Sequence, residues 1–122
     1  MYPIGYILFM KSAQLISLEI YATDEGRVPF IEWLDSLKDK MVRYRIKERL
    51  DRISLGNWGD HKPIAQGVLE LRFDFGSGYR VYFGRKADTI VLLLCGGDKR
   101  SQKKDIKKAI QYWQDYLGGV NQ

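Results

Sequence analysis

The amino-acid sequence predicts an α+β domain in which helices pack on a small, curved, mostly antiparallel sheet of four strands. Alternating apolar residues mark strands within residues 14–22 and 68–84, and residues 89–95 form a nearly unbroken apolar run. Apolar residues that recur at spacings of three and four mark three helices. The resulting element order is β-α-α-β-β-β-α. Because 122 residues suit one compact core, we interpret residues 10–122 as a single domain.

The first predicted strand is the segment QLISLEIYA, residues 14–22. The side that we expect to face the core carries Ile16, Leu18 and Ile20. The opposite side carries Ser17, Glu19 and Tyr21. This period of two is typical of a strand with one buried face.

Two helices should follow and form a helical hairpin. The first begins at Pro29, which is tolerated in a first helical turn, and ends near Lys38. Its apolar positions are Phe30, Trp33, Leu34 and Leu37. The second helix has Asp39 as a candidate N-cap, and Gly56 can take the left-handed conformation that ends a helix. Its apolar stripe consists of Val42, Ile46, Leu50 and Ile53.

A β-hairpin is predicted in the segment VLELRFDFGSGYRVYFG, residues 68–84, after a loop over residues 56–67. One side of the two strands carries Leu69, Leu71, Phe73, Tyr79, Val81 and Phe83. The side away from the core carries Glu70, Arg72, Asp74, Arg80 and Tyr82. A turn at the Gly-Ser-Gly tripeptide brings Arg72 and Arg80 within about one residue pair of each other. Like charges at such positions repel unless an anion lies between them.

The chain should end with a central strand and a basic helix. The apolar run TIVLLLC is typical of a strand that is covered on both faces. Ser101 is a candidate N-cap for a helix with the apolar positions Ile106, Ala109, Ile110, Trp113 and Leu117. The remaining surface of this helix carries Lys103, Lys104, Lys107 and Lys108.

Charge is distributed unevenly along the chain. Residues 1–39 hold three basic and six acidic side chains, whereas residues 40–122 hold 17 basic and nine acidic ones. This asymmetry favours a polyanionic partner, of which nucleic acid is the commonest. A solvated lysine-rich surface is the alternative interpretation.

The cysteine content and the N-terminal segment indicate where in the cell the protein is located. The single cysteine, Cys95, lies in an apolar run, which predicts a core thiol in a reducing cytoplasm without an intramolecular disulfide. The apolar first eleven residues are too short to span a bilayer, so no membrane association is expected. Met10 is followed by an ordinary polar start, and we therefore interpret residues 1–9 as a non-native or loose N-terminal extension.

Several classes of catalytic site are excluded. His61 is the only histidine, and the chain has no Gly-x-Ser-x-Gly motif, which argues against a hydrolase triad. One histidine and one cysteine cannot supply the usual zinc sets, and no phosphate-binding P-loop motif occurs. We expect no metal and no cofactor.

The chemistry that remains is a convergence of cations. Arg72 and Arg80 share a face, and Lys99 follows the last strand, just before a helix N-terminus. Three such cations would clamp one phosphate. In a ribonuclease, they would stabilise the charge that develops when a 2′-hydroxyl attacks its own phosphodiester, without a metal.

A proton acceptor would still be needed, because arginine does not lose its proton in proteins. Lys99, whose pKa neighbouring cations can lower, is the first candidate. The other candidates for proton transfer are His61, Tyr82 and Asp98. The competing interpretation is structural: a surface ion pair for each arginine, such as Arg72 with Glu70 or Asp74, and an ordinary loop lysine at position 99.

Three segments resemble the phage-derived, HigB-like branch of the RelE/ParE toxin superfamily, often called addiction-module killer proteins. They are PFIEWLDSLKD, RLDRISLGNWGDHKPIAQGVLELRFDFGSGYRVYF and IVLLLCGGDKRSQKKDIKKA, and the match runs from about Leu15 to Trp113. The resemblance implies a small RelE-like domain that is the toxin of a type II toxin–antitoxin system. It further implies an mRNA endoribonuclease that acts in the ribosomal A site, inhibits translation and forms a hetero-oligomer with a helix-turn-helix antitoxin.

The family motifs fall on positions already noted. The arginine of the family's GYR strand matches Arg80, that of ELR matches Arg72, and the basic residue after the last strand matches Lys99. Where RelE-type members have a tyrosine in the last helix, this chain has Asp105, so the proton acceptor stays open. The resemblance implies RNA-backbone contacts at Lys62, Arg100, Lys103, Lys104 and Lys107.

Two other functions fit the same resemblance. A ParE-like toxin would inhibit DNA gyrase by binding, with Arg72 and Arg80 as structural or interface residues. An inactive remnant would use its basic face only to bind an acidic segment of an antitoxin. A shared fold does not distinguish these functions from RNA cleavage.

Overall fold

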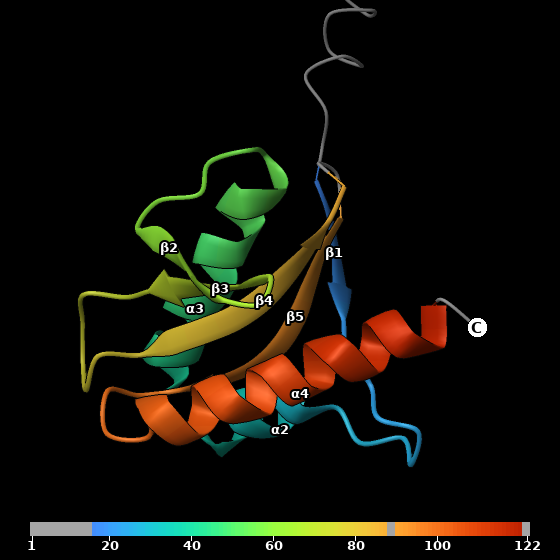
Figure 1. The fold of residues 1–122 in the computed structure, drawn as a ribbon. Helices are drawn as coiled ribbons and strands as arrows, with labels where there is room; N and C mark the ends of the chain where they lie inside the picture. Colours follow the sequence, from blue (N-terminus) through green and yellow to red (C-terminus); the bar gives the residue numbers. More distant parts are fainter. Residues whose placement is uncertain (1–15, 88–89, 121–122) are drawn as a thin grey trace, which may run out of the picture.

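The computed structural model describes residues 16–87 and 90–120 (Figure 1). Our interpretation of residues 1–9 as an extension falls outside the described residues. The elements, in chain order, are β1 (Ser17–Ile20), α2 (Pro29–Ser36), α3 (Lys40–Ser54), β2 (His61–Ala65), β3 (Val68–Arg72), β4 (Arg80–Lys86), β5 (Ile90–Gly97) and α4 (Gln102–Val120). The α+β class is confirmed.

The sheet has five strands in the described part of the chain, not four. Their spatial order is β1-β5-β4-β3-β2, with β1 parallel to β5 and every other pair antiparallel. The additional strand is β2, which lies in the segment predicted to be a loop. The prediction of a mostly antiparallel sheet was right, and the strand count was wrong.

Strand β2 was missed because its composition is that of an edge strand. Pro63 cannot donate to a ladder, and β2 lies at the end of the sheet, where proline is tolerated. A register shift between Pro63 and Ala65 further weakens the alternation. Gln66 and Gly67, both with positive φ, form the two-residue turn that joins β2 to β3.

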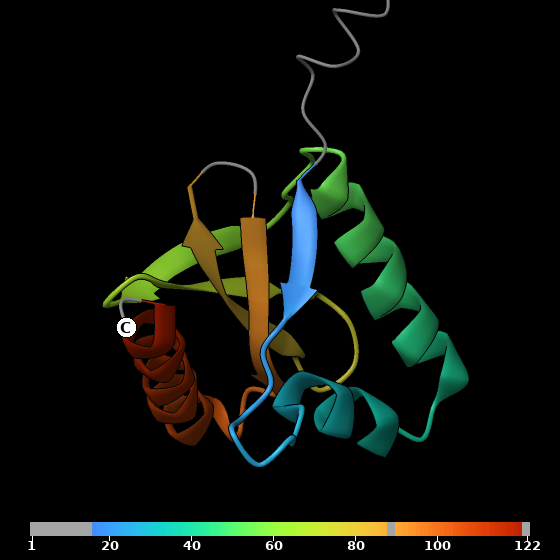
Figure 2. The same ribbon diagram turned by 90° about the vertical axis from the view of Figure 1, so that its right-hand side faces the viewer.

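The helices cover both faces of the sheet (Figure 2). Helices α2 and α3 lie on one side and α4 lies on the other. Helix α3 has Asp39 as its N-cap, whose carboxylate accepts from the Met41 N–H at 2.9 Å, as predicted. The figure shows α2 and α3 splayed apart rather than side by side, so the predicted helical hairpin was wrong.

Two hydrophobic cores result. The first core lies between the sheet and α2 and α3, and it includes Phe30, Leu34, Ile46, Leu50, Ile53, Leu71, Val81, Phe83 and Leu93. The second core lies between the sheet and α4, and it includes Tyr21, Val68, Tyr82, Leu92, Leu94, Cys95, Ala109 and Trp113. Strand β5 contributes to both cores, which confirms the prediction of a strand covered on both faces.

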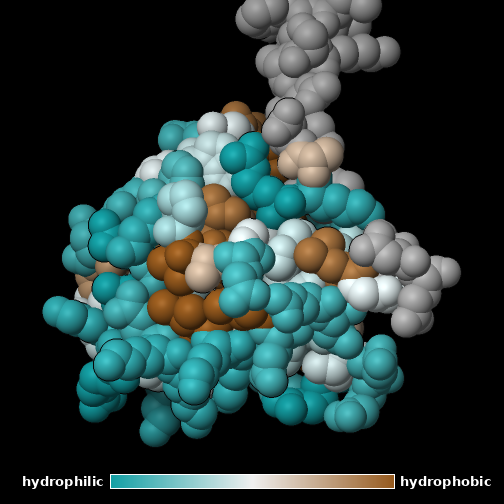
Figure 3. Space-filling view, viewed as in Figure 1, coloured by the Kyte–Doolittle hydropathy of each residue, from teal (hydrophilic) through white to brown (hydrophobic). Residues whose placement is uncertain are grey.

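The face predicted to point away from the core is therefore largely covered. Tyr82 is fully buried on it, and Tyr21, expected on the outer side of β1, is only 5% exposed. Conversely, Ile20, expected to face the core, is 44% exposed. The outer side of α4 is hydrophilic, and apolar side chains reach the surface over the strands beside it (Figure 3).

Candidate functional site

Arg72 and Arg80 lie directly opposite each other at one end of the β3–β4 ladder. They are register partners, with Arg72 last in β3 and Arg80 first in β4. Partners in an antiparallel pair face the same side of a sheet, and here that is the side covered by α4. The predicted proximity of the two arginines is confirmed.

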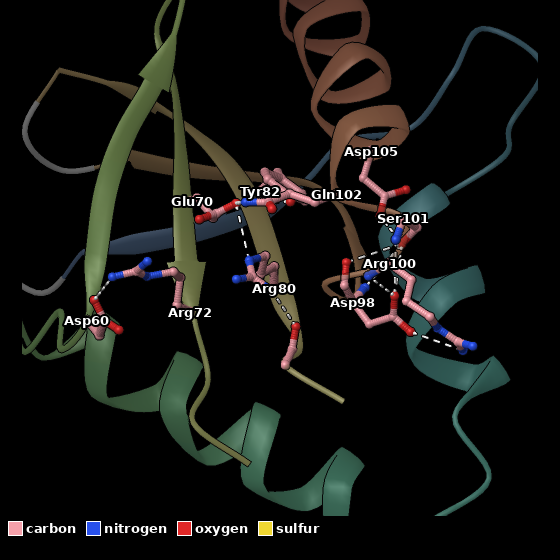
Figure 4. A network of polar contacts seen from close by, with 11 residues as sticks. Asp60, Glu70, Arg72, Arg80, Tyr82, Asp98, Arg100, Ser101, Gln102 and Asp105 are labelled. Carbon is pink, nitrogen blue, oxygen red and sulfur yellow. Dashed lines mark hydrogen bonds and ion pairs between the residues drawn. The ribbon is translucent and has the colours of Figure 1, made fainter. Parts of the chain in front are cut away.

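The Arg80 side chain is held on two sides (Figure 4). Its Nη1 donates to the carbonyl oxygen of Gly78 at 2.7 Å, within the turn that joins the two strands. Its Nε lies 3.6 Å from Oε2 of Glu70, at ion-pair rather than hydrogen-bond distance. Only 13% of the Arg80 side chain is exposed, so the guanidinium has little freedom to turn towards bulk water.

Glu70 is a fully buried carboxylate that sequence reasoning treated only as a surface ion-pair partner. Its Oε2 accepts from the Tyr82 hydroxyl at 3.1 Å and from Nε2 of Gln102 at 2.9 Å. Gln102 is the first residue of α4, so the contact links the sheet to that helix (Figure 4). The alternating pattern placed Glu70 on the outer face, and nothing in the pattern indicated that α4 covers it.

Arg72 has a different carboxylate partner. Its Nη2 lies 3.4 Å from Oδ1 of Asp60, and both side chains are substantially exposed. The Arg72 carbonyl oxygen accepts from Nη1 of Arg49 at 2.9 Å, which ties the end of β3 to α3. Each arginine therefore has an ion-pair partner, but Arg72 pairs with Asp60 rather than with Glu70 or Asp74 as expected, and Glu70 pairs with Arg80 instead.

Both arginines retain a buried donor without an acceptor. Nε of Arg72 and Nε of Arg80 are buried and make no hydrogen bond within the described residues. A buried donor that lacks an acceptor costs roughly 1–3 kcal/mol. For Arg80, this Nε–H faces Glu70 at ion-pair distance, whereas Arg72 has no such partner at Nε. An anion between the two strand ends would supply an acceptor to Arg72.

Lys99 lies beside the same turn. Its backbone nitrogen donates to the Ser77 carbonyl oxygen at 3.4 Å, and its side chain is exposed. A methyl group added at Gly78 would lie 3.3 Å from Nη1 of Arg80 and 3.4 Å from Cβ of Lys99. Lys99 and Arg80 thus flank one glycine, and we call Arg72, Arg80 and Lys99 the cation cluster.

The loop before α4 contains an anion of its own. The Asp98 carboxylate accepts from the backbone N–H groups of Arg100 and Ser101, at 2.9 and 3.2 Å. Partial burial acts to raise the pKa of Asp98, but these hydrogen bonds and the charge of Arg100 outweigh it and hold the pKa below its usual value. Asp98 is therefore a weak base. Its carboxylate also occupies the backbone N–H groups at the start of α4, which were expected from the sequence to favour a bound anion.

Asp105 is the second buried acidic residue among those described. Its Oδ2 lies 2.5 Å from the Ser101 hydroxyl, which donates to it. Burial raises the pKa of Asp105, although the hydrogen bond from Ser101 opposes the shift. Gly97 is required beside it, because a Cβ there would lie 1.8 Å from Oδ2 of Asp105.

The other candidates for proton transfer lie apart from the cation cluster or inside the protein. Tyr82 is fully buried, and burial, followed by the charge of Glu70 and the hydrogen bond to it, raises its pKa well above the usual value. His61 pairs with Leu71, which lies in the first core, so it faces the opposite side of the sheet from Arg80. Its ring lies 5.4 Å from that of Trp58.

The lysines expected to contact an RNA backbone are exposed. Lys62 pairs with Glu70 across β2 and β3 and therefore faces the same side as the two arginines. Arg100 is 91% exposed and lies 3.8 Å from Asp98. The lysines of the first turns of α4 are all exposed: Lys103, Lys104 and Lys107.

The described residues contain neither a candidate metal-binding cluster nor a helix that could span a membrane. Within residues 16–87 and 90–120, no group of three or more histidine, cysteine, aspartate or glutamate side chains is placed to hold a metal ion. No helix in these residues is both long and apolar enough to cross a membrane.

Comparison with known proteins gives the family. The model of the family described as "Phage derived protein Gp49-like (DUF891)" matches residues 32–114. The chain belongs to this Gp49-like family. The family is associated with the toxins of toxin–antitoxin systems. The matched segment contains α3, the whole of the β2–β5 sheet and the cation cluster.

The chain is also similar to a protein from Haemophilus influenzae. That protein, described as uncharacterized, is 48% identical over 80 residues, which cover 66% of this chain and 81% of the relative. A toxin of this family has an antitoxin as its expected partner.

Proposed function

We propose that this Gp49-like protein is a RelE/HigB-like toxin that cleaves mRNA on the ribosome without a metal and thereby stops translation. One observation carries the proposal: two arginines meet at adjacent strand ends, where the buried Nε–H of Arg72 has no acceptor and the Arg80 guanidinium is held by Glu70 and Gly78. Buried unpaired donors are costly, and a phosphodiester oxygen is an acceptor of matching charge.

In the proposed mechanism, the cation cluster binds the scissile phosphate. Arg72 and Arg80 approach it from β3 and β4, and Lys99 approaches it from the turn before α4. When the ribose 2′-hydroxyl attacks the phosphorus atom, its oxygen bonds to phosphorus, the bond from phosphorus to the 5′-oxygen breaks, and that oxygen leaves as a hydroxyl after taking up a proton from water. Negative charge develops on the phosphoryl oxygens during this step. Fixed cationic donors stabilise that charge, because little reorganisation is needed at the moment of reaction.

Lys99 is the proposed proton acceptor of the 2′-hydroxyl. Tyr82 is fully buried, His61 faces the other side of the sheet, and the carboxylate of Asp98 is held by backbone donors. Lys99 is exposed and adjoins Arg80 at Gly78.

The exposed cations around the site have a separate proposed role. Lys62 and the first-turn lysines of α4 contact the RNA backbone on either side of the cleaved bond. Contacts of this kind add affinity but little base preference, and they weaken as salt increases. An antitoxin would neutralise the toxin by forming a complex with it in the cytoplasm.

Mapping of RNA 5′ ends after a short induction in cells tests this proposal. Wild-type protein should produce new ends within translated reading frames, and Lys99→Ala should remove them. The matched control is Lys47→Ala, a change of an exposed lysine on α3. Growth arrest with DNA damage and without new mRNA ends would overturn the proposal in favour of gyrase inhibition.

A further inference from the structure

The neighbouring charges of Arg72 and Arg80 pose a structural problem. They are register partners on adjacent strands, so their positive charges repel across a short distance. Asp60, the partner of Arg72, is largely exposed, and its charge is therefore screened by water. Glu70 is different, because it is 0% exposed and lies two residues before Arg72 on the same face.

We propose that Glu70 is a positioning residue that fixes the Arg80 guanidinium for phosphate binding. Glu70 approaches Arg80 from the interior, at 3.6 Å, while Gly78 accepts from Nη1 at the turn. The third guanidinium nitrogen, Nη2, makes no hydrogen bond to the described residues. The guanidinium is thereby anchored on two sides and keeps a donor for a ligand. This inference rests on the proposed function.

Glu70 can do this because it is itself held. The Tyr82 hydroxyl and the Gln102 amide both donate to Oε2, one from within the sheet and the other from α4. Oε1 is buried and accepts no hydrogen bond in the described part of the chain. The positive charge of Arg80 is therefore the main compensation for burying this carboxylate. The dependence is mutual, and each side chain restricts the other.

A positioning role for Glu70 predicts that RNA binding and RNA cleavage respond differently to loss of its charge. A purely structural role predicts that both decrease together. Glu70→Gln keeps the size of the side chain and an oxygen acceptor, but it removes one negative charge beside the phosphate site. RNA should bind at least as tightly as to wild-type protein, because an anion close to its backbone is gone. Cleavage should nevertheless slow by about 10- to 100-fold, because a misplaced donor stabilises the transition state less well.

The test combines cleavage, binding and a spectroscopic measurement on the full chain. Cleavage is followed in a reconstituted translation reaction with a defined mRNA, and binding is followed by fluorescence anisotropy with a labelled single-stranded RNA. Exchange of the Arg80 Nε proton with water is followed by NMR in the absence of RNA. The matched control is Glu19→Gln, the same chemical change at an exposed position on β1.

Glu70→Gln should slow cleavage, preserve or tighten RNA binding and accelerate exchange of the Arg80 Nε proton, and Glu19→Gln should change none of these. Tyr82→Phe, which removes the 3.1 Å hydrogen bond to Glu70 and keeps its charge, should shift cleavage and exchange in the same direction by less. If Glu70→Gln does not fold, the Tyr82→Phe variant tests the positioning role of Glu70 in its place.

Failure of this inference is distinguishable from failure of the proposed function. If wild-type protein cleaves mRNA and both variants cleave and exchange as wild type does, the positioning role is refuted alone. Weakened RNA binding in parallel with cleavage would also refute it, because that result indicates a general structural defect. If wild-type protein does not cleave, the proposed function fails, and unchanged Nε exchange in Glu70→Gln would then refute the positioning role as well.

Discussion

Replacing Arg80 by alanine should destabilise the fold, although Arg80 is the first residue of its strand. The substitution leaves the Glu70 carboxylate fully buried, with hydrogen bonds from Tyr82 and Gln102 but without its ion-pair partner. At 3.6 Å, and with an effective dielectric constant of about 20, the lost attraction is roughly 5 kcal/mol.

Two effects reduce this figure. Loss of Arg80 also removes its repulsion from Arg72, and the protein relaxes around the unpaired carboxylate. Removing one partner from a buried ion pair typically costs about 3–5 kcal/mol. We therefore expect Arg80→Ala to lower the free energy of unfolding by about 3 kcal/mol.

A double-mutant cycle isolates the cause. Glu70→Gln in the Arg80→Ala background removes the unpaired charge and should restore about 2 kcal/mol of the lost stability. The assay is urea unfolding followed by tryptophan fluorescence at neutral pH, with the unfolding free energies of all four proteins compared. The double variant should remain inactive in growth inhibition, because the phosphate-binding cation is still missing.

Additive effects in this cycle would refute the reasoning. If Glu70→Gln destabilises the Arg80→Ala protein as much as it destabilises the wild type, the two side chains are not coupled. Unchanged stability of Arg80→Ala alone would have the same meaning, because it would show that Glu70 does not need its partner.

Three further predictions address packing, reactivity and the site. Gly84→Ala should destabilise the protein by about 2 kcal/mol in urea unfolding, because its Cβ would lie 2.3 Å from the buried Trp113 ring. The control is Gly118→Ala, which has open space around it and should be neutral or stabilising. Equal effects of the two substitutions would contradict the packing of Gly84 against Trp113. Burial raises the pKa of the Cys95 thiol from 9.0 to about 12, which reduces its thiolate fraction at pH 8 about a thousandfold. A thiol reagent should therefore label Cys95 only after denaturant is added, and rapid labelling of native protein would show that the thiol is accessible. His61→Ala should retain RNA cleavage while Lys99→Ala loses it, and the reverse pattern would move proton transfer to the other face of the sheet.

The pairing of Arg72 with Arg80 could be predicted because it depends on local sequence. The alternation around the Gly-Ser-Gly turn fixes the register of one hairpin, and Arg72 and Arg80 became partners from that register alone. The N-cap at Asp39 and the left-handed Gly56 are equally local, and both were found as expected. Such features need no knowledge of distant contacts.

Features that depend on distant contacts were missed. Glu70 reads as a surface residue until α4, about thirty residues later, covers its face and supplies Gln102. Strand β2 reads as a loop because only its pairing with β3 makes a strand of residues that include Pro63. Tyr21 and Ile20 exchanged their expected environments because a second core on the α4 side competes with the first for apolar side chains.

The chemistry of the cut RNA ends tests the central claim most directly. Purified protein is added to a reconstituted translation reaction, and the fragments of a defined mRNA are analysed by mass spectrometry. Attack by the 2′-hydroxyl at the cation cluster predicts 2′,3′-cyclic phosphate on one fragment and 5′-hydroxyl on the other, with both products absent for Lys99→Ala. Intact mRNA, or fragments that carry 5′-phosphate, would contradict the account.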